Sequence, residues 1–534
     1  MTNSFRPQRI NTMTALSKAR SFVGPTISAL FIALVAVVVG GFSALLPASF
    51  SARLGFLIAG AVVVLLALLM SAGARAPRAG IRYLLFTWVV VSVVWPHYLT
   101  FRGLPGPGVN PIRLVYWSMA ALWFFWFVGS KEFRHQLLAR LSTFRPFVIL
   151  LSAYLVWGLI CSVFSKLPFV SIYHSIQLMA GPVLIFLVAL SCLRDRQDVD
   201  RVLLLVVIAA ILAVVVGLVE AVKQKNLFYD LVPSLFPQGG EGELSWAEQL
   251  IRDKSRDGNY RVMSTFVHPL TFGEYLALSL PLAIFMAGYA VKATRRMIGF
   301  IAIPLIFIGL YICHTRSPLL AVGMAVLGLV GSLGVRAVRQ RASFSAAIAG
   351  FFFLVAVPIA AVALIVVGLE MSAGRTIGEV GSSSARLVMF QRGGTLVFEQ
   401  PLLGYGPGFA AVTLGFLPGF TSLTIDSYYL SVALESGLPG LLVFFAMLAY
   451  PIGKGLATSA RIPGIDGARL AVIAVSLLGF AVVKLVLSQP DNLAAVFLML
   501  ALLCISLEVG SPAKAERETP TPVRARKWSP EYRD

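Results

Sequence analysis

Long apolar runs recur along the chain between residues 24 and 507, and short polar segments separate them. Each run has about 18–22 residues, which is enough for a helix to cross roughly 30 Å of hydrocarbon. The pattern predicts about fourteen spans. Their expected bounds are 24–46, 53–72, 82–100, 112–129, 146–165, 169–193, 202–222, 266–291, 297–313, 317–334, 346–368, 437–453, 469–488 and 490–507. We therefore expect an all-α polytopic integral membrane protein.

Two connecting segments are much longer than the others, and long loops between packed helices frequently carry function. They lie at 223–265 and 369–436. The predicted organisation is a basic tail at 1–23, an N-terminal bundle of about seven spans at 24–222, the first long loop at 223–265, central spans at 266–368, the second long loop at 369–436, C-terminal spans at 437–507 and a disordered tail at 508–534.

The second long loop has a pattern of its own, "SSSARLVMFQRGGTLVFEQPLLGYGPGF". Its serines are suited to cap a helix, and an amphipathic helix of about 15 residues should follow, with Arg386 and Arg392 at polar positions. Pro401 should end that helix. The glycines of "GYGPG" should give the next turn positive φ angles or let a ligand come close. The block "TIDSYYLSVALESGLPGLLVFF" then begins a helix that should run into the next span.

The distribution of charge adds one thing to this prediction, which is the orientation of the spans in the membrane. The chain is 58% hydrophobic and 13% charged, and its net charge is +20. Lys and Arg gather in alternate short loops and in both tails, which is a positive-inside pattern. Both termini are therefore expected in the cytoplasm and both long loops outside, and no nucleic-acid partner is expected. The four cysteines suit neither a disulfide framework nor zinc, and the first apolar run is too long for a cleavable signal peptide.

Arginine on the external side runs against this orientation rule, so external arginines are candidate functional residues. Four of them are singled out, at the entry to the eighth span, at the turn between the ninth and tenth spans, and in the second long loop: Arg261, Arg316, Arg386 and Arg392. Guanidinium groups bind phosphate oxygens in pairs and stay charged, which suggests an anion site. The alternative is contact with lipid headgroups or with a nearby carboxylate.

The block at 424–445 contributes the other candidates. Asp426 is a candidate general base or sugar ligand, although Asp is also a common helix N-cap. Tyr428 and Tyr429 fit an interfacial aromatic belt first and sugar contact second. Glu435, like Glu274, could contact a sugar or pair with an arginine.

Two external histidines, His268 and His314, could transfer a proton or contact phosphate. The remaining three, His97, His135 and His174, are interpreted as structural. The "DVD" at 198–200 is interpreted as a helix start rather than as a metal motif. No metal site and no cofactor is expected.

Four of these segments, taken in order, resemble the bacterial O-antigen ligase and polysaccharide polymerase family. They are "RVMSTFVHPLTFGEYLALSLPL", "HTRSPLLAV", "RLVMFQRGGTLVFEQPLLGYGPGF" and "TIDSYYLSVALESGLPGLL". "NPIRLVYW" at 110–117 also resembles an element of exopolysaccharide members. The motifs cover about a third of the chain.

The resemblance implies a metal-independent glycosyltransferase of the bacterial inner membrane with a plan similar to GT-C enzymes and two long periplasmic loops. It implies that a sugar chain on undecaprenyl pyrophosphate is moved to the next carrier-linked repeat unit. Arg261 and Arg316 then match arginines that hold the pyrophosphate, and Arg386 matches the arginine that opens the loop helix. Further partners would be a chain-length regulator and export machinery.

One departure from the family pattern bears on the reaction. Where O-antigen ligases carry histidine in "HNSYL", this chain has Ile425 and Asp426. Blocks with aspartate look more like exopolysaccharide polymerases, which favours a polymerase over a ligase. If the acceptor needs a base, Asp426 is the first candidate and His268 the second.

Three other functions remain open at this stage. A ligase would join the finished chain to lipid A core. A flippase or ion-coupled transporter would use polar groups deep in the membrane, such as Lys484 and Glu220. A cell-wall synthase fits the number of spans and the two-loop plan less well.

Overall fold

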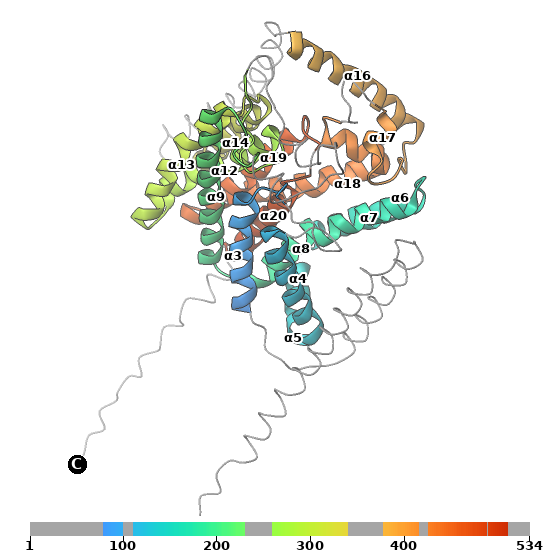
Figure 1. Ribbon diagram of the computed structural model, residues 1–534. Coiled ribbons are helices and arrows are strands. Elements are labelled where there is room, and N and C mark those ends of the chain that lie inside the picture. The colour runs from blue at the N-terminus through green and yellow to red at the C-terminus, as the bar shows by residue number, and fades with distance from the viewer. Residues whose placement is uncertain are drawn as a thin grey trace, which may run out of the picture.

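The computed structural model of the chain describes residues 78–99, 110–229, 259–339, 377–415, 425–488 and 490–510. Helices make up most of this part, and no strand runs through it (Figure 1). The helices are α3 (Arg78–Val94), α4 (Pro111–Gly129), α5 (Lys131–Thr143), α6 (Arg145–Val163), α7 (Pro168–Leu178), η1 (Met179–Val183), α8 (Leu184–Cys192), α9 (Arg196–Lys223), α12 (Pro269–Tyr289), α13 (Ala293–Ile312), α14 (Ser317–Arg339), α16 (Ile377–Glu399), α17 (Ala410–Leu414), α18 (Tyr428–Ser459), α19 (Gly464–Val483) and α20 (Leu493–Val509).

The expected membrane spans coincide with these helices. Nine helical segments in the described part are long and apolar enough to cross a membrane. One of them joins α7, the π-helical turn η1 around Pro182, and α8. Helices α3 and α20, with 17 residues each, match two further predicted spans. The spans predicted at 24–46, 53–72 and 346–368 lie outside the described residues, so the total of about fourteen stays a prediction.

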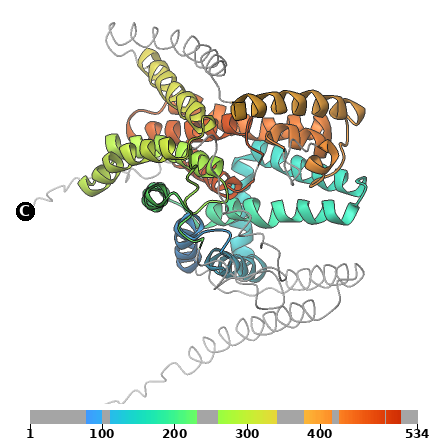
Figure 2. The same cartoon turned by 45° about the horizontal axis from the view of Figure 1, so that its top comes forward.

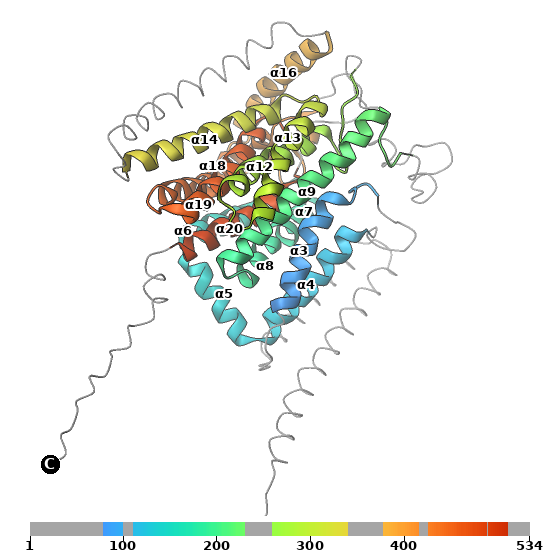
Figure 3. The same cartoon turned by 90° about the vertical axis from the view of Figure 1, so that its left-hand side faces the viewer.

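Helix α12 forms the centre of the bundle. It packs against α9, α13, α14 and α19, and nearly all of its side chains are buried. Figures 1 and 3 show these helices around it. Because α12 is enclosed on all sides by protein, residues at its N-terminal end are held in fixed positions relative to the loops that surround them.

The helix ends that carry basic residues meet at one end of the bundle, which we call the basic end. Arg82 of α3 and Arg469 of α19 pair with Asp198 and Asp200 at the start of α9, at 3.2 and 2.7 Å. Arg140 of α5 pairs with Glu508 of α20 at 2.7 Å. The "DVD" segment thus forms structural ion pairs. These ion pairs hold together the loops that the charge pattern assigns to one side of the membrane.

A break in α18 joins the glycine-rich turn to the helix. Gly437 has φ 67° and ψ −175°, which is not helical, and Pro439 has no N–H to give to the carbonyl four residues earlier. The backbone groups released by this break find new partners in the turn after α16. Tyr405 N–H donates to the Leu434 carbonyl at 2.7 Å, and Gly406 N–H donates to the Glu435 carbonyl at 3.0 Å.

Two further hydrogen bonds satisfy backbone groups at the same break. Leu438 N–H donates to the Pro401 carbonyl at 2.8 Å. Trp157 Nε1 of α6 donates to the Ser436 carbonyl at 2.8 Å. Each of these hydrogen bonds joins the break in α18 to the turn at 401–408 or to α6, and we call this set of bonds the interlock. It fixes the turn at 401–408 and α6 against the start of α18.

Helix α16 folds back over the start of α18 through a small apolar core. Met389 and Val397 of α16 pack with Ala410 and Leu414 of α17 and with Leu430 of α18. Figure 2 shows α16 beside α18, with the α6–α7 pair on the other side. The helix ends at Glu399, just before Pro401, and the turn glycines at 404, 406 and 408 have positive φ, both as predicted.

Two expectations for this loop need correction. The helix has 23 residues rather than about 15, because it begins at Ile377. The serines at 382–384 therefore lie inside α16 and do not cap its start.

We predict that Gly437→Ala destabilises the protein through the interlock. A Cβ at this position would lie 2.2 Å from the Leu402 carbonyl oxygen, and the backbone conformation is one that L side chains rarely adopt. The strained conformation alone costs about 1–3 kcal/mol. The thermal midpoint of the detergent-purified variant should fall clearly. Gly453→Ala on the same helix, where a Cβ would meet no atom within 4 Å, is the control. Equal midpoints for both variants would contradict the interlock.

Candidate functional site

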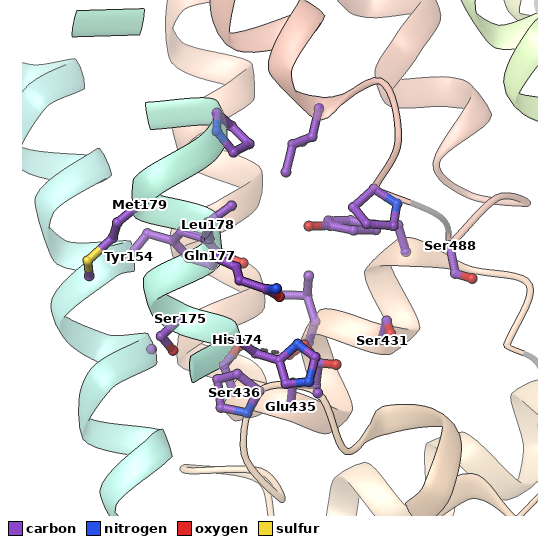
Figure 4. A pocket seen from close by; sticks show the side chains of 18 of the residues that line it. Tyr154, His174, Ser175, Gln177, Leu178, Met179, Ser431, Glu435, Ser436 and Ser488 are labelled. Atoms are coloured by element: carbon purple, nitrogen blue, oxygen red, sulfur yellow. Dashed lines mark hydrogen bonds between the residues drawn. The ribbon is translucent and has the colours of Figure 1, made fainter. Parts of the chain in front are cut away.

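A cavity of about 660 Å³ opens between α6, α7, the 407–411 segment, α18 and the start of α20 (Figure 4). Its wall is mixed, with apolar side chains such as Leu155 and Val432 between polar ones. The polar lining residues that can hydrogen-bond or titrate are Tyr154, His174, Ser175, Gln177, Tyr428, Ser431, Glu435, Ser436, Ser488 and Asp491. A pocket of this size with convergent polar groups is the usual form of a ligand site.

Polar side chains reach into the cavity from two facing walls. His174 and Gln177 extend from α7, while Ser431 and Glu435 extend from α18 (Figure 4). Asp491 enters from the start of α20. Hydroxyl, amide, imidazole and carboxylate groups on opposite walls can bind the donors and acceptors of a sugar ring at the same time.

Gly408 forms part of one edge of the cavity. The Glu435 carboxylate lies close to the backbone of Gly408 and Ala410. The His174 ring packs against Gly408 so closely that a Cβ there would lie 2.3 Å from the ring. Gly408 also has φ +85°. Glycine is therefore required here, because any side chain would push the imidazole out of its position.

The structure brings Asp426 and Arg386 together beside the cavity. Arg386 Nε donates to Asp426 Oδ2 at 3.2 Å, and both side chains are partly exposed. The neighbouring Ile425 lines the cavity. The N-cap of α18 is Ser427, whose Oγ accepts from Leu430 N–H, so Asp426 is not used as a cap. Its role as a base stays a prediction.

Arg261 lies in the 260–264 segment, which is held by hydrogen bonds to Glu220 of α9 and to the end of α13. The Glu220 carboxylate accepts from Tyr260 Oη at 2.8 Å, from Met263 N–H at 3.2 Å and from Ser264 N–H at 2.7 Å. Val262 N–H donates to the Ile312 carbonyl at the end of α13, next to the turn that carries Arg316. Arg261 and Arg316 are thus brought to the same end of the bundle.

The remaining predicted residues are placed in separate surroundings. Arg392 is exposed on α16 and reaches Gly415 at the end of α17. His268 is the N-cap of α12, where its Nδ1 accepts from Leu270 N–H at 3.1 Å. Tyr429 Oη donates to the Ala481 carbonyl at 2.9 Å, whereas Tyr428 lines the cavity. As formed by the described residues, the cavity is lined by none of the four predicted arginines.

A fully buried ion pair lies behind the cavity. Lys484 Nζ is 2.9 Å from Glu274 Oε1, and both side chains have no solvent exposure. Asn492 Nδ2 donates to the other Glu274 oxygen at 2.7 Å, and the Lys484 ammonium lies 5.5 Å from the centre of the Tyr428 ring. Glu274 is therefore engaged by a lysine and an asparagine, and the suggested arginine partner is not used.

Sequence reasoning found only Tyr428 and Glu435 among the polar cavity residues, and it interpreted His174 as structural. His174 and Gln177 lie three residues apart in "PFVSIYHSIQL", and Asp491 follows Pro490 at a span boundary. Two polar residues one helical turn apart on an apolar span signal a shared polar face. That spacing was available from the sequence alone. The described residues contain no group of three His, Cys, Asp or Glu side chains able to hold a metal ion.

We predict that Lys484→Met strongly destabilises the protein, because it leaves the Glu274 charge buried without its partner. Breaking such a pair costs about 3–5 kcal/mol. The double variant Lys484→Met/Glu274→Gln removes both charges and should recover much of the loss, since the new amide oxygen can still accept from Asn492. Thermal midpoints in detergent measure both effects. Losses that simply add in the double variant would show that the two charges do not stabilise each other.

Comparison with known protein families agrees with the motifs. Residues 300–445 match the family model described as O-antigen ligase, and this match includes α14, α16, α17 and the start of α18. No curated protein matches the chain in sequence. Arg316, Arg386, Arg392 and Asp426 lie inside the matched segment, while Arg261 and His268 precede it. Residues 300–445 are therefore similar to the O-antigen ligase family, which agrees with the resemblance of these motifs to the O-antigen ligase and polysaccharide polymerase family.

Proposed function

We propose that this protein is a polysaccharide polymerase of the bacterial inner membrane. In this proposal it transfers a sugar chain from undecaprenyl pyrophosphate to a carrier-linked repeat unit on the periplasmic side, with both termini in the cytoplasm. The reaction needs a site that binds sugars and a means of stabilising the pyrophosphate as it leaves.

One observation carries this proposal. Two segments of the matched region, at 401–411 and 425–436, are joined by backbone hydrogen bonds and form one wall of the cavity. The other wall comes from α6 and α7, outside the matched segment. A cavity with one wall built on the family motifs, and with polar groups on both walls, is the natural place for the sugar that this family transfers.

Arg386 is suited to bind the leaving pyrophosphate. Asp426 engages only its Nε among the described residues, so both Nη groups of the guanidinium can bind phosphate oxygens in a fork. Negative charge develops on those oxygens as the glycosidic bond breaks, and preorganised donors stabilise it. We propose that Arg261, Arg316 and Arg392 contribute to the same field, and that guanidinium groups rather than a divalent cation carry this role.

The alternatives differ in the acceptor or in the use of buried charges. A ligase would use the same donor with lipid A core as the acceptor, and Ile425 in the cavity wall, at the family's histidine position, favours the polymerase. A transporter would use Lys484 and Glu220. Lys484 pairs with Glu274, and Glu220 fastens the 260–264 segment, which supports structural roles for both.

The test is purified protein in detergent or liposomes with a lipid-linked repeat unit as the only substrate. A ladder of polymer should form without added nucleotide or metal and should persist with a chelator present. Supplying lipid A core as a second acceptor separates the alternatives, because a ligase would join single units to it and form no ladder. Protein that moves the substrate across liposomes without forming glycosidic bonds would refute the enzymatic proposal.

We predict that Arg386→Ala lowers the rate of polymer formation by about 100-fold or more, as expected for loss of one donor to a developing oxyanion. Arg386→Lys should recover only part of the rate, because an ammonium cannot form the fork. Arg145→Lys, on an exposed residue at the start of α6, is the matched control and should keep full activity. Full activity of Arg386→Ala at equal protein level would remove Arg386 from the pyrophosphate site.

A further inference from the structure

The acceptor hydroxyl must lose a proton during transfer, and the cavity contains three side chains that could take it: His174, Glu435 and Asp491. These three side chains differ in the groups that lie beside them. The Glu435 carboxylate lies close to the backbone of Gly408 and Ala410, at the turn whose Gly406 N–H donates to the Glu435 carbonyl. Asp491 lies within electrostatic reach of His97 and Lys484.

His174 is placed differently from both carboxylates. Its side chain is exposed to the cavity, and its ring is held by packing against Gly408 and by an edge contact with Tyr173. Within the described part of the chain, no hydrogen bond occupies its ring nitrogens. A ring that is fixed in position but has a free lone pair meets the geometric requirement for a general base.

Asp426 lacks this geometry. It is paired with Arg386 at 3.2 Å and does not line the cavity. The neighbouring position that does line the cavity is Ile425, which has no group able to accept a proton. The segment just before α18 therefore offers no imidazole to the cavity, whereas α7 contributes that of His174.

We propose that His174 contacts the acceptor hydroxyl and takes its proton in the transfer step. This proposal rests on the polymerase function proposed above. The acceptor oxygen forms a bond to the anomeric carbon of the donor sugar while the bond from that carbon to the pyrophosphate oxygen breaks. The bonding electrons leave with the pyrophosphate, and the hydroxyl proton moves to a ring nitrogen of His174. The imidazolium then returns the proton to water through the open cavity.

The experiment measures the initial rate of polymer formation from the lipid-linked repeat unit as a function of pH. The other titratable groups that face His174 across the cavity are Tyr154, Tyr428, Glu435 and Asp491, so the profile is compared between variants that leave these unchanged. His174→Gln should lower the maximal rate by about 100-fold or more while the apparent affinity for the donor changes little. It should also lose the rise in rate that imidazole deprotonation gives in the wild type.

Two further variants separate chemistry from folding. His174→Ala leaves space in the cavity, and added free imidazole should restore part of its rate, which a purely structural side chain would not allow. His135→Gln, on the exposed face of α5 far from the cavity lining, is the matched control and should keep the wild-type rate and pH profile.

The outcomes separate this proposal from the one that it rests on. If the wild type forms a ladder and His174→Gln matches His135→Gln in rate and pH profile, the role of His174 is refuted and the polymerase stands. A rate loss in His174→Gln with an unchanged pH profile and no rescue by imidazole also refutes it. If the wild type forms no polymer, both proposals fail together.

Discussion

The break in α18 at Gly437 is the constraint on which the site depends. An α-helix that loses its bonds at one turn exposes backbone groups that must be satisfied, most of all where water is scarce. Here the carbonyls of Leu434 and Glu435 accept from the 405–406 segment, and Ser436 accepts from Trp157. Three elements far apart in sequence are joined by these bonds, and the cavity forms where they meet. The glycines and the proline of "ESGLPG" thus select the partners of the helix as well as its shape.

Periodicity and local chemistry determine much of this arrangement. The spans in the described part follow from hydropathy because a membrane helix needs a fixed apolar length. The end of α16 before Pro401 and the positive φ at Gly404, Gly406 and Gly408 follow from the backbone properties of proline and glycine. The start of α16 was mispredicted because serine is favoured at an N-cap but tolerated inside a helix, so local preference gave way to the helix extending to Ile377.

The candidate site was less predictable because its members come from different parts of the chain. The pairing of Arg386 with Asp426 joins residues 40 positions apart, and Lys484 and Glu274 are about 210 positions apart. His174 enters through the packing of α6 and α7 against the turn at 401–408, which no local pattern specifies. Its i, i+3 relation to Gln177 indicated a polar face on α7, but not the segment that the face would meet. Long-range partners of this kind depend on tertiary structure, whereas caps and turns depend on neighbours in sequence.

The placement of the arginines argues for a divided site rather than a single cationic pocket. The sequence grouped Arg261, Arg316, Arg386 and Arg392 around one anion. The described structure instead brings Arg261 and Arg316 together beside the end of α13, places Arg386 next to Asp426, and leaves the cavity wall with neutral polar and acidic groups. A lipid-linked sugar chain is divided in the same way, since its charge is confined to the pyrophosphate and its sugars offer hydroxyls. Guanidinium groups inside the sugar cavity would compete for those hydroxyls and for Glu435 and Asp491. For the proposed function, keeping them outside leaves the cavity to hydrogen-bonding groups, so that charge recognition and sugar recognition would act on different parts of one substrate.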